Sequence, residues 1–118
     1  MKEIKAYIRA NKLDEVVQAL ENAGATDMTI IPIEAIGKDL DDVSVYLKGV
    51  LDKYKYNKVA KLEMVCTAED VSTFTDAIRE HGYTGQPGDG MIFIGNIEGA
   101  IKIRTGESGK KVLKPSSK

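Results

Sequence analysis

The sequence predicts an α+β fold in which an antiparallel four-stranded sheet carries two helices on one face. Three observations support this prediction. Apolar residues occupy alternate positions in some segments, as they do in strands. In other segments they recur every three or four positions, as they do in helices. The 118 residues, 42% of them hydrophobic, suit one globular domain with a modest core.

The first strand is expected at residues 2–9, where alternate apolar positions give one face toward the core. A helix should follow, because leucine and valine recur at helical spacing in residues 13–20. Asn11 is the expected N-terminal cap of this helix. Gly24 is expected to end it.

Two further strands are expected at residues 27–36 and 58–66. The earlier one is rich in isoleucine, and Pro32, which has no amide hydrogen, indicates an edge position. Its isoleucines fall on both faces, so we expect other copies of the chain to cover the outer face. The later strand ends in Cys66, which we interpret as a small buried hydrophobe.

The second helix is expected to start after Thr67, which is spaced from Asp70 as in a capping box. Gly82 is expected to end this helix. We interpret the nearby His81 as a solvated side chain rather than a catalytic one. Residues 91–97 give the fourth strand, so the order of elements is that of the ferredoxin-like βαββαβ fold.

Residues 37–57 follow neither pattern, apart from a short helical piece expected near residues 43–51. A loop of this length in a compact domain is usually functional or disordered. The domain is expected to span residues 1–107. Residues 108–118 are polar and basic, and we expect them to form a flexible tail.

Charge and composition argue against several classes of function. A net charge of -1 gives no basic excess for binding nucleic acid. No segment is apolar enough to span a membrane, and the start of the chain lacks the pattern of a signal peptide. One cysteine forms no disulfide within the chain, which fits a reducing compartment. We therefore expect a cytoplasmic protein without membrane insertion.

Residues 83–91, YTGQPGDGM, hold more glycine than a turn requires. Glycine lets successive amide groups approach an anion, so this loop is a candidate phosphate site. Further on, Lys102 and Arg104 alternate in a segment that we expect to be extended, with both side chains on one side. They are candidates for a polyphosphate clamp, and solvated surface charges explain the pattern equally well.

Several stretches of the sequence resemble the PII signal-transduction proteins and their PII-like relatives. They include MKEIKAYIR, KLDEV, TDMT and KLEMV, and above all TGQPGDGMIF and IKIRTGE. The last two are similar to the B-loop (residues 83–91) and the C-loop (residues 99–107) of that family. Residues 37–57 occupy the position of the family's T-loop. The resemblance covers residues 1–107.

The resemblance implies a homotrimer of ferredoxin-like subunits that binds ATP, ADP or AMP in the clefts between subunits. It also implies a regulator without enzymatic activity, cofactor or metal, whose T-loop docks on a target transporter or enzyme. The implied nucleotide-binding residues are Thr29, Ile36, Gly37, Lys38, Val65, Thr84, Gly85, Gly88, Asp89, Gly90, Met91, Lys102 and Arg104.

The chain departs from the family pattern in its regulatory parts. Lys38 and Asp39 stand where the family has arginine and glutamine, and the negative charge of Asp39 disfavours 2-oxoglutarate. Gln86 and Met91 stand where the B-loop usually has lysines, and Lys102 replaces an arginine. Fewer cations beside the γ-phosphate predict that ADP or AMP is preferred to ATP.

These departures also resemble the PII-like branch that includes regulators of inorganic-carbon uptake and carboxysome function. Lys38 would suit a small anion such as bicarbonate beside the nucleotide. The tyrosines of the T-loop do not align with the tyrosine that is uridylylated in some PII proteins, so we expect no uridylylation. They are Tyr46, Tyr54 and Tyr56.

Three alternatives stay open. One is a conventional nitrogen-regulatory PII protein that senses ATP, ADP and 2-oxoglutarate. Another is a slow ATPase with a metal held by Asp39, Asp41 and Asp42, although such loop carboxylates are more often solvated. The third is a trimer of the same fold without a nucleotide, such as the metal-linked CutA type, against which the B-loop and C-loop segments argue.

Overall fold

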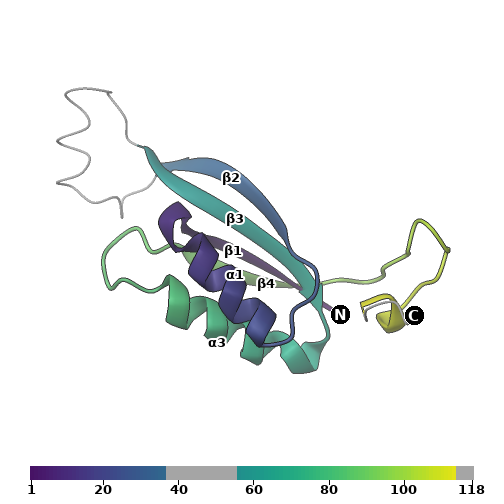
Figure 1. Cartoon of the computed structure of the whole chain (residues 1–118). Coiled ribbons are helices and arrows are strands. Elements are labelled where there is room, and N and C mark those ends of the chain that lie inside the picture. The colour runs from purple at the N-terminus through teal and green to yellow at the C-terminus, as the bar shows by residue number, and fades with distance from the viewer. Residues whose placement is uncertain (37–55, 114–118) are drawn as a thin grey trace.

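The computed structural model describes residues 1–36 and 56–113, and the remaining residues lie outside the described part. Four strands form one antiparallel sheet, and two helices cover one of its faces (Figure 1). The predicted α+β, ferredoxin-like fold class is confirmed. The elements are β1 (Lys2–Arg9), α1 (Leu13–Asn22), β2 (Thr29–Ile36), β3 (Tyr56–Cys66), α3 (Val71–Gly82) and β4 (Met91–Asn96).

The strand order β2-β3-β1-β4 places the N-terminal strand inside the sheet. β1 pairs with β3 over its whole length, so that Arg9 lies opposite Val59. On its other side β1 pairs with β4 up to the pair Tyr7 and Met91. β2 is an edge strand, which confirms the position predicted from Pro32.

The core fills the space between the sheet and the helices and uses the alternate positions that the sequence predicts. Ile4, Leu20 and Leu62 have no exposed surface. The thiol of Cys66 is buried, as expected, and burial raises its pKa. The other buried core residues are Ala6, Ile8, Val16, Ala25, Ala60, Met64, Phe74 and Ile78.

The sheet face away from the helices carries exposed apolar side chains. Ile31, Met91 and Phe93 lie on this face, and Phe93 is 54% exposed. Tyr7 makes an edge-on ring contact with Phe93 at 6.0 Å between ring centroids. An apolar surface of this kind is typical of an interface with another protein chain.

The ends of α1 confirm one prediction and correct another. Gly24 ends the helix at φ 104°, and the amide of Ala25 donates to the carbonyl of Leu20 at 2.9 Å, as in a Schellman motif. The prediction that Asn11 caps the helix was wrong. Residues Ala10–Lys12 form a 3-10 turn, η1, and no side chain caps α1.

The ends of α3 also differ from the prediction. The hydroxyl of Thr67 donates to the carboxylate of Asp70 at 3.3 Å, and no side chain caps a backbone amide there. A capping box is therefore absent, and the 3-10 turn η2 (Ala68–Asp70) leads into the helix. Gly82 is the last helical residue, as predicted, and the extended backbone of Tyr83 follows it.

The C-loop is a hairpin rather than the extended segment that the sequence predicts. The amide of Lys102 donates to the carbonyl of Glu107 at 2.8 Å, and the amide of Gly106 donates to the carbonyl of Lys102 at 2.8 Å. Arg104 therefore lies in a turn. Beyond it, residues Lys110–Leu113 of the predicted tail form a 3-10 turn, η3.

Candidate functional site

The B-loop joins α3 to β4 at one end of the subunit (Figure 1). Three of its glycines have left-handed backbone angles, with φ of 84° at Gly85, 105° at Gly88 and 91° at Gly90. Residues that carry a side chain rarely adopt these backbone angles. The sequence showed more glycine in this loop than a turn needs. The left-handed backbone angles of the loop explain why these glycines are required.

The carboxylate of Asp89 organises the B-loop from inside. Its Oδ2 accepts hydrogen bonds from the amides of Thr84 at 2.8 Å and Gly85 at 2.9 Å. Its Oδ1 accepts a hydrogen bond from the hydroxyl of Thr84. The amide of Gln86 in turn donates to that hydroxyl oxygen at 3.1 Å. Asp89 is thus engaged within the loop.

Arg9 holds the B-loop from the end of β1 and was not among the residues that the sequence predicts. Its Nε donates to Oδ1 of Asp89 at 2.9 Å, and one of its terminal nitrogens donates to the carbonyl of Pro87 at 2.8 Å. The side chains of Arg9 and Asp89 are both about a quarter exposed, at 23% and 24%. Water therefore screens this ion pair less than a surface pair.

The amides of the second half of the loop remain available to a ligand. In the part of the chain that the structure describes, the amides of Gly88, Asp89 and Gly90 donate to no protein acceptor. Successive amides around left-handed glycines form a site for an anion. The amides of Thr84 and Gly85, which the sequence also predicts for the nucleotide, are used by Asp89 instead.

Gly90 passes close to the backbone of β1. A β-carbon at this position would lie 1.7 Å from the carbonyl oxygen of Tyr7 and 2.8 Å from its carbonyl carbon. Only a residue without a side chain fits there. The B-loop is therefore held at two places, by the Arg9–Asp89 ion pair and by the contact of Gly90 with the sheet.

The environment of Asp89 controls its protonation. Burial raises its pKa, but the hydrogen bonds from Thr84, Arg9 and Gly85 together outweigh burial and hold the pKa well below its usual range. A carboxyl group whose pKa is lower in the folded state than in the unfolded state stabilises the fold above the unfolded pKa. That stabilisation is lost as the pH falls through the folded pKa.

Asp89→Asn is expected to remove this pH-dependent stabilisation. At pH 7 the variant should be less stable than the parent protein by about 2 kcal/mol, because an amide cannot replace the charged hydrogen bonds. Below about pH 4 the difference should shrink. Thermal midpoints measured at pH 7 and pH 3 at one protein concentration check this. Asp76→Asn, at an exposed position of α3, is the matched control. Equal midpoints at pH 7 would contradict the expectation.

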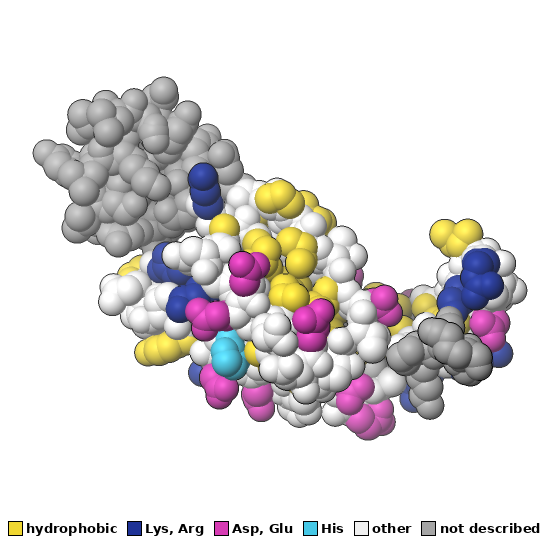
Figure 2. All heavy atoms as spheres, in the orientation of Figure 1, with side chains coloured by type: hydrophobic (Ala, Val, Ile, Leu, Met, Phe, Trp, Pro, Cys, Tyr) yellow, Lys and Arg dark blue, Asp and Glu magenta, His cyan; other side chains and the backbone are white. Residues whose placement is uncertain are grey.

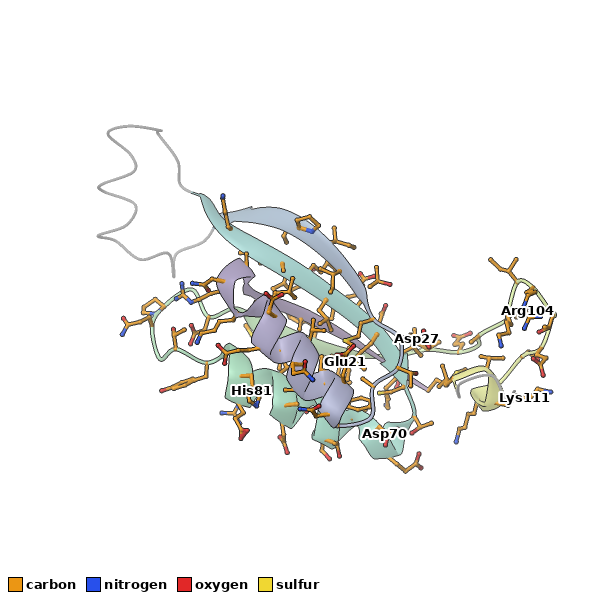
Figure 3. All side chains as sticks on the ribbon, in the orientation of Figure 1. Glu21, Asp27, Asp70, His81, Arg104 and Lys111 are labelled. Carbon is orange, nitrogen blue, oxygen red and sulfur yellow. The ribbon has the colours of Figure 1, made fainter. Side chains whose placement is uncertain are left out.

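The basic residues of the C-loop lie at the other end of the subunit. Figure 3 places Arg104 far from His81, which lies near the B-loop at the end of α3. On the face seen in Figure 2, acidic side chains spread over the helices, whereas lysine and arginine side chains gather at the two ends. One subunit therefore does not bring Lys102 and Arg104 to its own B-loop.

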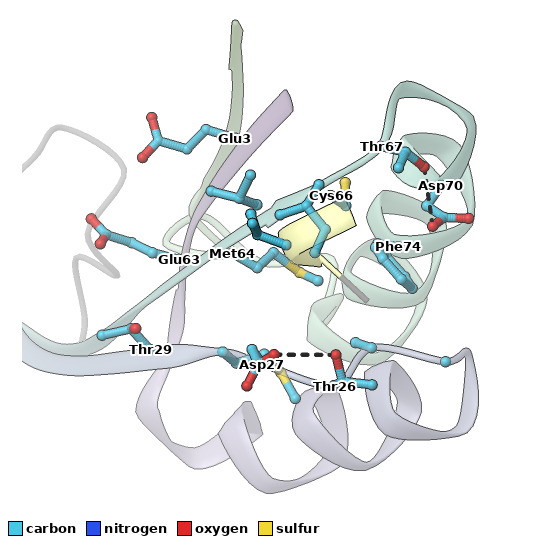
Figure 4. A pocket seen from close by; sticks show the side chains of 16 residues that line it. Glu3, Thr26, Asp27, Thr29, Glu63, Met64, Cys66, Thr67, Asp70 and Phe74 are labelled. Carbon is cyan, nitrogen blue, oxygen red and sulfur yellow. Dashed lines mark hydrogen bonds between the residues drawn. The ribbon is translucent and has the colours of Figure 1, made fainter. Parts of the chain in front are cut away.

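Thr29 and Val65 also lie at the end of the subunit where the C-loop is found. They line a cavity of about 610 Å³ together with Asp27, Glu63 and Val112 of η3 (Figure 4). A hydrogen bond from Lys61, at 2.8 Å, lowers the pKa of Glu63. Because acidic groups line this cavity, it suits the uncharged part of a ligand better than a phosphate.

The remaining predicted residues lie at or beyond the root of the T-loop. Ile36 is the last residue of β2 and pairs with Tyr56, at the end of the sheet from which the T-loop leaves. Gly37, Lys38 and the short helix predicted near residues 43–51 lie outside the described residues. The carboxylates of Asp39, Asp41 and Asp42 lie outside them too.

Three other features of the described residues bear on the candidate site: the surroundings of His81, the clustering of possible metal ligands and the length of the helices. His81 is 38% exposed, with Nε2 3.3 Å from a carboxylate oxygen of Glu80. Among residues 1–36 and 56–113, histidine, cysteine, aspartate and glutamate form no group of three that could hold a metal. The helices described in that range are too short or too polar to cross a membrane.

Comparison with known proteins identifies the family. The family described as Nitrogen regulatory protein P-II matches residues 1–107. Nitrogen regulatory protein P-II 2 of Methanothermobacter thermautotrophicus is 42% identical over 113 residues, which cover 96% of this chain and 97% of the relative.

A second relative, Nitrogen regulatory protein P-II of Bradyrhizobium diazoefficiens, is 40% identical over 109 residues, which cover 92% of this chain and 96% of the relative. The family match at residues 1–107 covers the whole of the B-loop and of the C-loop, on which the resemblance was based. The chain belongs to the P-II family of signal-transduction regulators.

Proposed function

We propose that this regulator binds an adenine nucleotide in a cleft between two subunits. The observation that carries the proposal is that the available amides of the B-loop and the cations of the C-loop lie at opposite ends of one subunit. A cleft that contains both the B-loop amides and the C-loop cations therefore needs two copies of the chain arranged head to tail. Such contacts close into a ring when the rotation fits, and the resemblance to the P-II family implies a ring of three subunits.

In this cleft the amides of residues 88–90 bind the phosphates, and Lys102 and Arg104 approach them from the neighbouring subunit. The base and ribose lie near Thr29 and Val65 of that neighbour, beside the acidic cavity. Ile36, Gly37 and Lys38, at the T-loop root of the first subunit, complete the site. Met91 borders it. Backbone amides and cations are the groups that bind phosphate in proteins.

The bound nucleotide controls the T-loop, which begins directly beyond Ile36. A loop at the edge of a ligand site changes its population of conformations when the ligand contacts one of them better. The target is a transporter or an enzyme that docks on residues 37–57. Lys38 offers a charge for a small anion, such as bicarbonate, next to the nucleotide.

The alternative function is that of a conventional nitrogen-regulatory P-II protein that responds to ATP, ADP and 2-oxoglutarate. The relatives named Nitrogen regulatory protein P-II favour it. Asp39 argues against it, since its charge repels a dicarboxylate. The two functions share the nucleotide site and differ in the second ligand.

Calorimetry with ATP, ADP and AMP tests the proposal. We expect ADP and AMP to bind more tightly than ATP, because Gln86 and Met91 leave the γ-phosphate without the two family cations. Adding 2-oxoglutarate should not strengthen ATP binding. ATP binding more than about tenfold tighter than ADP binding would contradict the preference. The absence of binding by all three nucleotides would contradict the function itself.

A further inference from the structure

Arg9 contacts the B-loop through two different groups of the loop. Its Nε meets the carboxylate of Asp89, and a terminal nitrogen meets the carbonyl of Pro87 at 2.8 Å and, more weakly, that of Gln86 at 3.5 Å. Asp89 is 80 residues away in the sequence. The guanidinium group thus connects a strand of the sheet to the turn of the loop.

The contact with Pro87 determines the direction of the next amide. The carbonyl of Pro87 and the amide of Gly88 belong to one planar trans peptide unit and point in opposite directions. When Arg9 holds the carbonyl on its own side, the amide of Gly88 faces the other way. That amide is one of the three that donate to no acceptor among the described residues.

The contact with Asp89 balances a charge next to the same amides. An unpaired carboxylate within the loop would repel a phosphate bound to the amides of residues 88–90. Arg9 pairs with it at 2.9 Å. Its planar fork suits a carboxylate and a carbonyl at once, whereas a lysine ammonium is a single point charge.

We infer that Arg9 is a positioning residue for phosphate binding at the B-loop, acting through Pro87 and Asp89 rather than through contact with the ligand. The inference rests on the proposed function. It assigns the ligand's charged end, a nucleotide diphosphate group, to the side of the loop that faces away from Arg9. Arg9 thereby aims the Gly88 amide and neutralises the carboxylate behind it.

The test compares Arg9→Lys and Arg9→Met with the parent protein by ADP calorimetry. We expect Arg9→Met to weaken ADP binding by roughly tenfold to a hundredfold, since it removes both charged hydrogen bonds. Arg9→Lys keeps the charge and loses the fork, so it should weaken binding by about tenfold. Lys12→Met, which removes a partly exposed cation 3.5 Å from Glu15, is the control and should bind ADP normally.

A second measurement separates positioning from general stability. The Gly88 amide signal in a nitrogen–proton NMR spectrum should shift in Arg9→Lys without ADP, while the thermal midpoint changes by only a few degrees. ADP binding by Arg9→Lys equal to that of the parent protein would overturn the inference, as would an unshifted Gly88 signal. A parent protein that binds no ADP would overturn the proposed function and this role together.

Discussion

Gly90→Ala is expected to destabilise the subunit and to abolish nucleotide binding. The new β-carbon would lie 1.7 Å from the carbonyl oxygen of Tyr7, well inside the contact distance of two atoms. Tyr7 is in β1, which pairs with strands on both sides, so its backbone cannot move away. At φ 91° alanine is also strained. The combined cost should be about 3 kcal/mol or more.

Gly109→Ala is the matched control for this prediction, because it adds the same methyl group at a left-handed glycine, φ 88°, where nothing beyond the neighbouring residues lies within 4 Å. Urea unfolding of both variants at one protein concentration measures the difference. ADP calorimetry on any folded Gly90→Ala protein tests whether the B-loop has been displaced. If both variants unfold at the same urea concentration, the close contact of Gly90 with β1 is not a constraint.

Mixing two inactive variants is expected to restore nucleotide binding. Met91→Glu places a carboxylate beside the B-loop, and Arg104→Glu reverses a charge of the C-loop, so each homotrimer should fail to bind ADP. In a mixed trimer, one cleft combines the intact B-loop of one subunit with the intact C-loop of its neighbour. Random mixing of equal amounts should yield about a quarter of the parent number of sites.

The measurement is the number of ADP sites per trimer after the two variants are unfolded together and refolded. Each variant refolded alone is the control, and light scattering establishes that it forms trimers. A mixture without binding would show that the B-loop and C-loop of one cleft come from the same chain. Binding by either variant alone would show that the reversed charge lies outside the site.

The strands and helices could be predicted from the sequence because their apolar residues recur with the period of a strand or of a helix, which places them on one face. Alternate apolar positions placed β1 at its observed bounds, and Pro32 placed β2 at the edge. They placed β3 to within two residues, because this strand begins at Tyr56 rather than at residue 58 and so takes the last two residues of the predicted loop 37–57. The same logic failed for the C-loop. Ile101, Lys102 and Ile103 alternate like a strand, yet among the described residues they pair only with the returning half of their own hairpin, through the bridge of Ile101 to Ser108, and a left-handed Gly106 turns the chain back.

The candidate site was only partly predictable from the sequence. The glycines of the B-loop predict its left-handed backbone angles, because these angles are a local property of the backbone. The anion site that they indicate stays a prediction. The role of Arg9 depends on a contact between residues that lie 80 positions apart, and no spacing in the sequence indicates it. Asp89 was predicted as one of the nucleotide-binding residues of the B-loop, which stays a prediction for its backbone amide. The structure shows its carboxylate engaged with Thr84, Gly85 and Arg9.

The position of β1 inside the sheet has a consequence for how the chain folds during synthesis. β1 is made first, but its partners come from residues 56–66 and 91–96. Most of the chain must therefore be synthesised before β1 can pair with both of its neighbouring strands. Folding that depends on such distant contacts is slower than folding by local contacts. Because Arg9 ends β1 and Asp89 precedes β4, the B-loop reaches its final conformation only when the last strand has joined the sheet.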